Sequence, residues 1–234
     1  MKMKKYLILF NIIIINFVSG QISFKILNLK GTDHNKYLLK IDITNETNKK
    51  LAIPLDTAWL KGYFSSEICP KFEEVEYPYL APTVLIMDEK QQYIEAHSAN
   101  LGYIDEKYIK LDDEFFSNKN KKQILINNWM KKENISDYSK AVTNLYLMDN
   151  IILLQPKQNF SYEIQLDISE LKYSELSALH DEYPLKMDKN YNLSLAICID
   201  KDVYNYLTPF QIKRLKKYNL FIGKIESNKF EIRY

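Results

Sequence analysis

The feature that most constrains the fold is an alternation of apolar and polar side chains between Tyr37 and Leu55. The apolar side chains recur at every second position, as Leu39, Ile41 and Ile43 and then as Leu51, Ile53 and Leu55. A period of two is that of a β-strand with one buried face. The polar stretch Asn45–Lys50 separates the two runs, so the segment predicts two strands joined as a hairpin. A lone hairpin is marginal in water, so the chain must supply a second layer that covers its apolar face.

Similar patterns recur along the chain and predict a mainly β fold with helical insertions. Further strands are expected at Ile22–Leu29, Thr83–Met87, Ile151–Leu154, Phe160–Ile168, Tyr191–Ile199, Leu220–Ile222 and Lys229–Tyr234, with Tyr93–Ala96 as a candidate partner of Thr83–Met87. Helices are expected at Lys121–Lys131, after the caps Ser136 and Ser169, and from the capping box at Thr208 to about Tyr218.

The first twenty residues have the pattern of an export signal. Three lysines precede the apolar run Tyr6–Val18, and Ser19-Gly20 suits cleavage before Gln21. The alternative is an uncleaved anchor, but the apolar run is shorter than the roughly 20 residues that span a bilayer. We therefore expect an exported protein, periplasmic or secreted, with no transmembrane segment after cleavage.

The rest of the chain, residues 21–234, predicts a single β-sandwich domain. The strand pattern stops after Leu55 and resumes at Ile151, and the residues between are aromatic-rich, then charged. No repeat or low-complexity linker divides the chain. We therefore interpret 56–150 as an irregular and helical insertion between strands of the main sheet.

The charge of the chain argues against a nucleic-acid partner. The chain has 32 Lys and Arg against 30 Asp and Glu, and the first twenty residues hold three lysines and no acid. The remainder therefore carries 29 basic against 30 acidic residues. A nearly neutral protein lacks the overall positive charge by which many proteins bind nucleic acids.

Two cysteines, Cys69 and Cys198, are present in a chain that we expect to be exported. The even number permits one disulfide, which oxidising compartments favour. The alternative is two unpaired thiols, since Cys198 lies in an apolar strand where a thiol packs readily. Their wide separation does not match the local spacing of a zinc site.

Four segments carry a resemblance to a known architecture. They are ITNETNKKLAIPL, LLQPKQNFSYEIQLDI, YNLSLAICID and the terminal GKIESNKFEIRY. In this order they resemble bacterial exported immunoglobulin-like β-sandwich domains, in which the last strand commonly follows a Gly…Ser-Asn turn. The resemblance covers about half of the mature chain, and the long segment 56–150 departs from it. It implies an immunoglobulin-like β-sandwich and no particular activity.

Three histidines, His34, His97 and His180, are the first candidates for catalysis or metal binding. Each has acidic residues nearby, but no spacing such as HExxH links them. We interpret them as solvated loop residues. His180 is the one to test first, because the sequence HDEYP places three ionisable groups together after a predicted helix.

Other charged groups and motifs give no site. The acidic groups Glu73-Glu74-Glu76 and Asp112-Asp113-Glu114 lack the turn-forming glycine of a calcium loop. The basic run Lys213–Lys217 suits the last turn of a helix, where cations complement the helix dipole. No signature of a serine or cysteine nucleophile or of a phosphate-binding loop is present. We therefore predict no catalytic residue, cofactor or metal.

An aromatic group just after the second strand of the expected hairpin is the strongest candidate for function. It comprises Trp59, Tyr63, Phe64, Tyr77 and Tyr79 within the segment 56–82. Loops on a rigid scaffold carry function more often than strands do, and exposed aromatic side chains anchor protein or sugar ligands. The alternative is that these rings cap the open end of the core.

These observations favour an exported binding or interaction protein whose partner is a protein, or less readily a glycan, contacted through 56–82. One alternative is an immunity or inhibitor protein that neutralises a secreted toxin or lytic enzyme. The other is a hydrolase or metal-dependent enzyme that assembles its scattered histidine and acidic residues in space.

Overall fold

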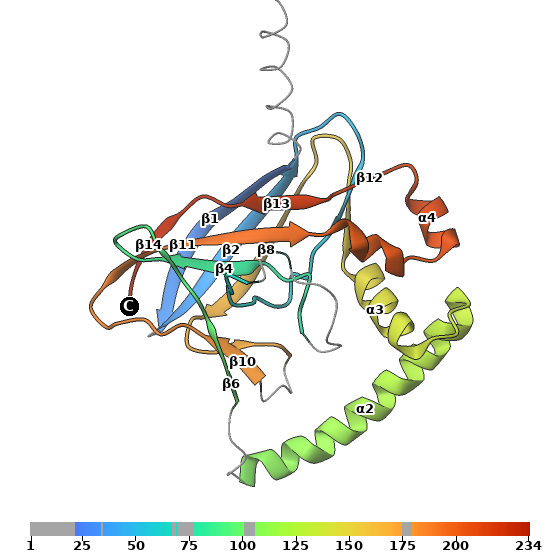
Figure 1. The fold of residues 1–234 in the computed structure, drawn as a ribbon, viewed down its shortest axis with the longest axis horizontal. Helices are drawn as coiled ribbons and strands as arrows, with labels where there is room; N and C mark the ends of the chain where they lie inside the picture. Colours follow the sequence, from blue (N-terminus) through green and yellow to red (C-terminus); the bar gives the residue numbers. More distant parts are fainter. Residues whose placement is uncertain (1–21, 34, 67–68, 70–76, 101–105, 175–178) are drawn as a thin grey trace, which may run out of the picture.

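The computed structural model describes residues 22–33, 35–66, 69, 77–100, 106–174 and 179–234, and only the main chain of 106–117. The fold is mainly β, with several sheets and few helices (Figure 1). The expected signal, His34 and the Glu73-Glu74-Glu76 group lie outside the described residues. None of the described helices combines the length and the apolar character needed to cross a membrane.

Among the described elements, two helices lie between two series of strands, and two shorter helices precede the last strands. The strands are β1 Ile22–Asp33, β2 Lys36–Asn45, β3 Leu51–Pro54, β4 Thr83–Met87, β5 Tyr93–Ile94, β6 His97–Asn100, β7 Ile151–Leu154, β8 Asn159–Asp167, β9 Leu171–Lys172, β10 Leu179–Glu182, β11 Asn190–Ile199, β12 Asn219–Leu220, β13 Gly223–Glu226 and β14 Phe230–Arg233. The helices are α2 Glu106–Glu133, α3 Tyr138–Asp149, the 3-10 helix η1 Lys201–Tyr206 and α4 Pro209–Leu215.

The described strands form four sheets around one main core. Their orders are β1-β2-β8, β12-β3-β7, β6-β10-β9 and β13-β11-β4-β5, and β14 also pairs with β11. Figure 1 shows β1, β2 and β8 side by side, crossing the long strand β11. The apolar faces of β2 and β11 contribute to the same hydrophobic cluster. The expected pairing of Thr83–Met87 with Tyr93–Ala96 is confirmed by the β4–β5 ladder.

The expected hairpin of two strands within Tyr37–Leu55 is wrong. β2 pairs with β1 and β8, whereas β3 pairs with β7 and β12 in another sheet. Both edges of β2 are therefore occupied, and β3 has no edge of β2 with which to pair. The two strands are instead successive parts of a long antiparallel ribbon, in which β2 and β3 run against β8 and β7.

A buried asparagine holds the ribbon together where it passes from one sheet to the other. Asn45 is fully buried, and its Nδ2 donates to the carbonyls of Lys49 (2.8 Å) and Gln155 (2.9 Å). Its Oδ1 accepts from the main-chain N–H of Thr47 (3.0 Å), and its own N–H donates to the carbonyl of Gln158 (2.9 Å). One side chain therefore fixes both connections, from β2 to β3 and from β7 to β8.

The segment 56–150 leaves the ribbon and returns to it at the same place. The Leu55 N–H donates to the Asn150 carbonyl (2.8 Å), just beyond the pair Pro54–Ile151. The segment is also part of the sheets, because its strand β4 pairs with β11. Its chain therefore contributes to the main core.

Two expected helices differ from the structure. α2 is much longer than Lys121–Lys131, since no glycine or proline interrupts Glu106–Glu133. It ends at Asn134, whose φ of 53° places it in the left-handed region. α3 is capped by Asp137, one residue after the expected Ser136, through a hydrogen bond from Lys140 N.

The helix expected after Ser169 is absent from the described residues. Ser169 donates from both its N–H and its hydroxyl to the Asp167 carboxylate, which makes a turn at the end of β8. The chain then forms β9 and β10, which pair with each other. The capping box at Thr208 is confirmed, with Gln211 as its partner.

We expect Asn45→Ala to lower the free energy of unfolding by about 2–3 kcal/mol, because several buried hydrogen-bonding groups lose their partner. The measurement is urea denaturation followed by circular dichroism. Asn159→Ala is the matched control, since the Asn159 side chain is exposed and such a change costs within about 0.5 kcal/mol. Equal losses in the two variants contradict the role given to Asn45.

Candidate functional site

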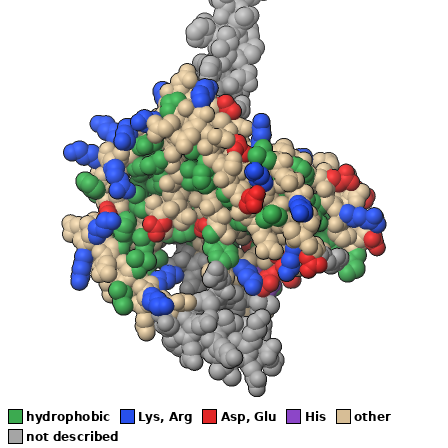
Figure 2. Space-filling view, turned by 180° about the vertical axis from the view of Figure 1, so that it is seen from behind, with side chains coloured by type: hydrophobic (Ala, Val, Ile, Leu, Met, Phe, Trp, Pro, Cys, Tyr) green, Lys and Arg blue, Asp and Glu red, His purple; other side chains and the backbone are tan. Residues whose placement is uncertain are grey.

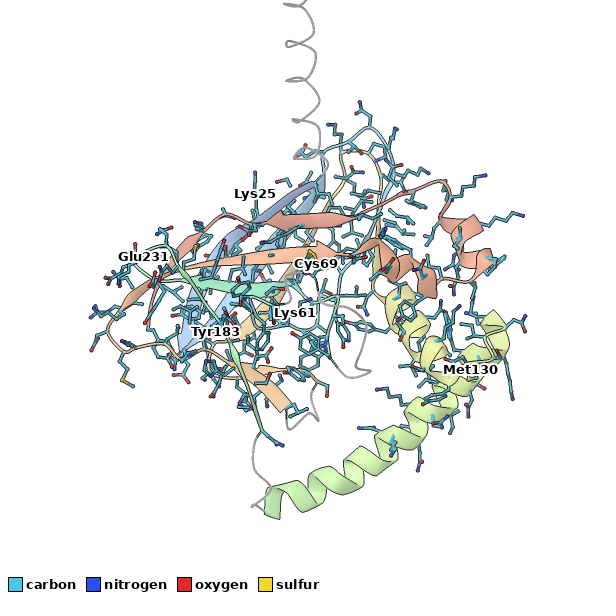
Figure 3. The ribbon with its side chains drawn as sticks, viewed as in Figure 1. Lys25, Lys61, Cys69, Met130, Tyr183 and Glu231 are labelled. Carbon is cyan, nitrogen blue, oxygen red and sulfur yellow. A yellow bond between two sulfur atoms is a disulfide. The ribbon has the colours of Figure 1, made fainter. Side chains whose placement is uncertain are left out.

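The segment that follows β3 contains a buried lysine. Lys61 is only 2% exposed, and its ammonium group donates to the Tyr79 carbonyl. The main chain of Lys61 is bridged to Thr83 at the start of β4, which holds the lysine inside the fold. Figure 3 labels Lys61 and Tyr183 in the interior of the molecule.

Burial has a marked effect on the protonation of Lys61. It lowers the pKa of the lysine from its ordinary value of 10.5 to about 7, because the charged form loses its hydration. The carboxylates of Asp56 and Asp181 act in the opposite direction and favour the charged form.

Asp181 connects this segment to the sheet of β6, β10 and β9. Its carboxylate accepts from the Gly62 N–H (2.8 Å), the Tyr173 hydroxyl (2.7 Å) and the Ser98 hydroxyl (3.2 Å). Burial raises the pKa of Asp181, and these three hydrogen bonds oppose the rise. The close approach requires a glycine, since a Cβ on Gly62 would lie 2.5 Å from the Ala96 Cβ and 2.9 Å from the Asp181 Cβ.

Two tyrosine hydroxyls complete this buried cluster. Tyr146 of α3 donates to the Asp56 carboxylate (2.9 Å) and accepts from the Leu80 N–H (3.3 Å). Tyr183 donates to the Val84 carbonyl and accepts from the Tyr63 N–H (2.9 Å). Burial raises the pKa of both phenols, so they remain neutral donors.

The buried cluster has the properties of a structural support. Asp56, Lys61 and Asp181 are each at most 4% exposed and are hydrogen-bonded to protein groups. A substrate therefore has no direct route to the amine. The cluster holds an irregular chain segment against the sheets through hydrogen bonds to its buried polar groups.

A surface groove lies next to this segment and contains Trp59. The groove has a volume of about 330 Å³. It is lined by Lys36, Ala58, Trp59, Leu60, Ile164, Gln165, Asp167, Glu170, Leu171 and Lys172. Its two lysines are ion-paired, Lys36 with Asp167 and Lys172 with Glu170, both at 3.4 Å. The groove therefore combines a half-buried indole ring with balanced charges.

The other aromatic candidates are distributed over different places. Tyr79 is buried, and the half-buried Tyr77 ring packs edge-on against Tyr79 and against Tyr173, with ring centres 5.0 Å apart in each case. Tyr63 and Phe64 are half-buried and pack against the main core. The structure therefore places Trp59 in the groove and the other four rings in or against the interior.

Cys69 and Cys198 are joined in a disulfide, with their Cα atoms 5.1 Å apart (Figure 3). The bond ties the irregular segment to β11 across 129 positions of sequence. In the chain-entropy model, closing so long a loop stabilises the fold by about 4–5 kcal/mol.

The histidines occupy two different environments. His97 is exposed on β6. The interpretation of His180 as a solvated loop residue is wrong, because it is 5% exposed and lies in β10, between β6 and β9. Its Nε2 is 3.9 Å from the Glu182 carboxylate. Within the described residues, no three His, Cys, Asp or Glu side chains are placed to hold a metal ion.

The basic run is only partly on a helix. Lys213 and Arg214 occupy the last turn of α4, where the sequence pattern places them, but α4 ends at Leu215, short of the expected Tyr218, so Lys216 and Lys217 follow it. Asp112-Asp113-Glu114 falls in the part of α2 of which only the main chain is described.

No protein-family model, curated protein or solved structure matches this chain.

Sequence reasoning missed the buried cluster. A lysine beside a glycine in an irregular segment has the pattern of a solvated residue, and nothing nearby in sequence marks Asp181 or Tyr146 as its neighbours. The apolar run Tyr79-Leu80-Ala81 between Pro78 and Pro82 is a local sign that this segment packs tightly.

We expect the protein to become more stable as the pH rises from about 7 towards 10. The folded pKa of Lys61 lies below its ordinary value, so in this window the unfolded chain binds the proton and the folded chain does not. Above about pH 10 the stability falls again, because tyrosines that stay neutral in the fold ionise when unfolded.

The measurement is the denaturation midpoint at several pH values, for the wild type and for Lys61→Met. The variant removes the titrating amine and flattens the rise. Lys157→Met is the control, since that amine is exposed. A rise of the same size in Lys61→Met shows that another group causes it.

Gly62→Ala is expected to lower the stability by about 2–3 kcal/mol, because the added methyl group overpacks a closed contact. Gly31→Ala is the matched control, since nothing lies within 4 Å of the position that a Cβ on Gly31 would occupy. Thermal unfolding of both variants measures the difference. Similar midpoints contradict the close packing of Gly62 against Asp181.

Proposed function

We propose that this protein is an exported binding protein that holds a protein ligand in the groove at Trp59. The observation that carries the proposal is the position of Trp59, half-buried at an open groove between the 58–60 segment and the ends of β8 and β9. Tryptophan is enriched among the residues that dominate protein interfaces, because it buries much apolar area at little entropic cost.

The rigidity of the groove supports binding. One wall belongs to β8, which is paired with β2 along its whole length. The other wall follows directly on Asp56 and precedes Lys61, both of which are fixed in the buried cluster. A preformed groove loses little conformational freedom when a ligand binds.

Balanced charge favours a protein over a nucleic acid. Each lysine of the groove has a carboxylate partner. The face seen in Figure 2 carries both basic and acidic side chains, with hydrophobic side chains between them.

Export is part of the proposal. It is supported by the N-terminal sequence pattern and by the disulfide between Cys69 and Cys198, a bond that forms and persists in oxidising compartments.

The immunoglobulin-like form of the β-sandwich is proposed as well. Its support is that the antiparallel sheet of β1, β2 and β8 shares a core with the sheet around β11, which is the layering of a β-sandwich.

The experiment pans a displayed library of random peptides, each about 15 residues long, on the purified protein and, in parallel, tests the protein on a glycan array. We expect peptides to be recovered, and Trp59→Ala to weaken their binding about tenfold or more, as loss of an interface anchor does. Phe210→Ala is the control, because this ring is 67% exposed on α4 and does not line the groove.

Thermal unfolding of both variants shows whether they remain folded. If Trp59→Ala binds peptides as well as the wild type does, the groove is not the binding site. If the protein binds glycans on the array and no peptide is recovered from the library, the proposal of a protein ligand is wrong.

A further inference from the structure

We propose that the ligand binds as an added β-strand along the free edge of β8, with one of its side chains in the groove at Trp59. This inference rests on the proposed function and specifies how the partner is recognised. The partner is a protein that offers an extended segment of about five residues.

The direction of the peptide groups in β8 follows from its pairing with β2. The Asn45 N–H donates to the Gln158 carbonyl (2.9 Å) at one end, and the Ile168 N–H donates to the Asn35 carbonyl (3.0 Å) at the other. The register between these ends has no shift. In an antiparallel pair, hydrogen-bonded positions alternate with positions whose peptide groups point away.

The outward positions in the middle of β8 are therefore Ser161, Glu163 and Gln165. No hydrogen bond joins the main chain of these three residues to any other part of the chain that the structure describes. Their side chains are exposed. Such a row of unpaired N–H and C=O groups is a template for another strand.

The opposite edge of the same sheet, formed by β1, is covered by a side chain from another part of the chain. At Ile26 of β1, the N–H donates to the Asn228 Oδ1 (2.9 Å), and the Asn228 Nδ2 donates back to the Ile26 carbonyl (3.1 Å). An asparagine from the turn between β13 and β14 thus covers that edge. In the described part of the chain, β8 has no equivalent cover.

The groove lies at one end of this free edge, since Ile164, Gln165 and Asp167 contribute to its lining. An added strand places alternate side chains on each face of the sheet, so one of them reaches the groove. The ion pairs leave no unbalanced charge there, and the indole of Trp59 favours an aromatic or aliphatic side chain. Main-chain bonds then supply affinity, and the groove supplies selectivity.

A second copy of this chain is a less suitable occupant. If two β8 edges paired about Glu163, the two glutamates would lie opposite each other, and like charges at such positions are destabilising. A foreign strand has no such constraint.

The test compares Gln165→Pro with Gln165→Ala for binding of a recovered peptide. Proline removes the outward N–H and breaks no bond to β2, which edge strands tolerate. Alanine removes the same side chain and keeps the N–H. We expect the proline variant to lose about tenfold or more in affinity, because a main-chain hydrogen bond to the ligand is lost without replacement. The comparison is with the alanine variant, which lacks the same groove-lining side chain but keeps that bond, so the difference between the two variants measures the main-chain contribution alone.

A second measurement leaves the protein unchanged. Peptides methylated at one main-chain nitrogen at a time are expected to lose affinity at every second position, since alternate N–H groups face β8. This result keeps the proposal testable if Gln165→Pro does not fold.

The outcomes separate the two proposals. If Trp59→Ala weakens binding while Gln165→Pro and the methylated peptides do not, the groove binds a protein but the strand addition is wrong. If no peptide is recovered, both proposals fail. Light scattering tests whether the protein forms a dimer. If Gln165→Pro abolishes a dimer that Gln165→Ala preserves, the edge of β8 binds a second copy of this chain, and the proposal of a strand from another protein is wrong.

Discussion

The rest of the structure depends on the pairing of β2 and β3 with β8 and β7. This ribbon passes from one sheet into another, and it turns at the buried side chain of Asn45, which bonds to both connections. A side chain amide can satisfy donors and acceptors of two chain segments at once, which a main-chain ladder cannot do where strands diverge. The ribbon also sets which edge of β8 remains free.

The long segment after Leu55 is held by polar contacts as much as by apolar ones. Lys61 and Asp181 are buried and hydrogen-bonded to other groups of the protein, and Gly62 permits the close approach between their segments. Buried polar networks are costly when incomplete and specific when complete. Here the network gives an irregular segment a defined path, and that path forms one wall of the groove at Trp59.

Much of the strand content could be predicted from local pattern. The alternation in Tyr191–Ile199 and Phe160–Ile168 has the period of a strand whatever its neighbours, and the capping box at Thr208 is closed by residues three positions apart. The pairing could not be predicted. The hairpin interpretation failed because alternation specifies a buried face but does not specify which strand lies alongside.

The candidate site shows the same division. The sequence by itself determined that aromatic side chains gather after Leu55, that apolar faces recur with a period of two, and that the charge of the chain is nearly balanced. Only the tertiary structure decided that Trp59 lies at a groove while Tyr79 is buried and that Gly62 bonds to the distant Asp181. It also decided that the outer edge of β8 pairs with no strand among the described residues. The physical reason is that periodicity and caps arise from neighbours along the chain, whereas burial, charge pairing and strand edges depend on contacts between distant segments.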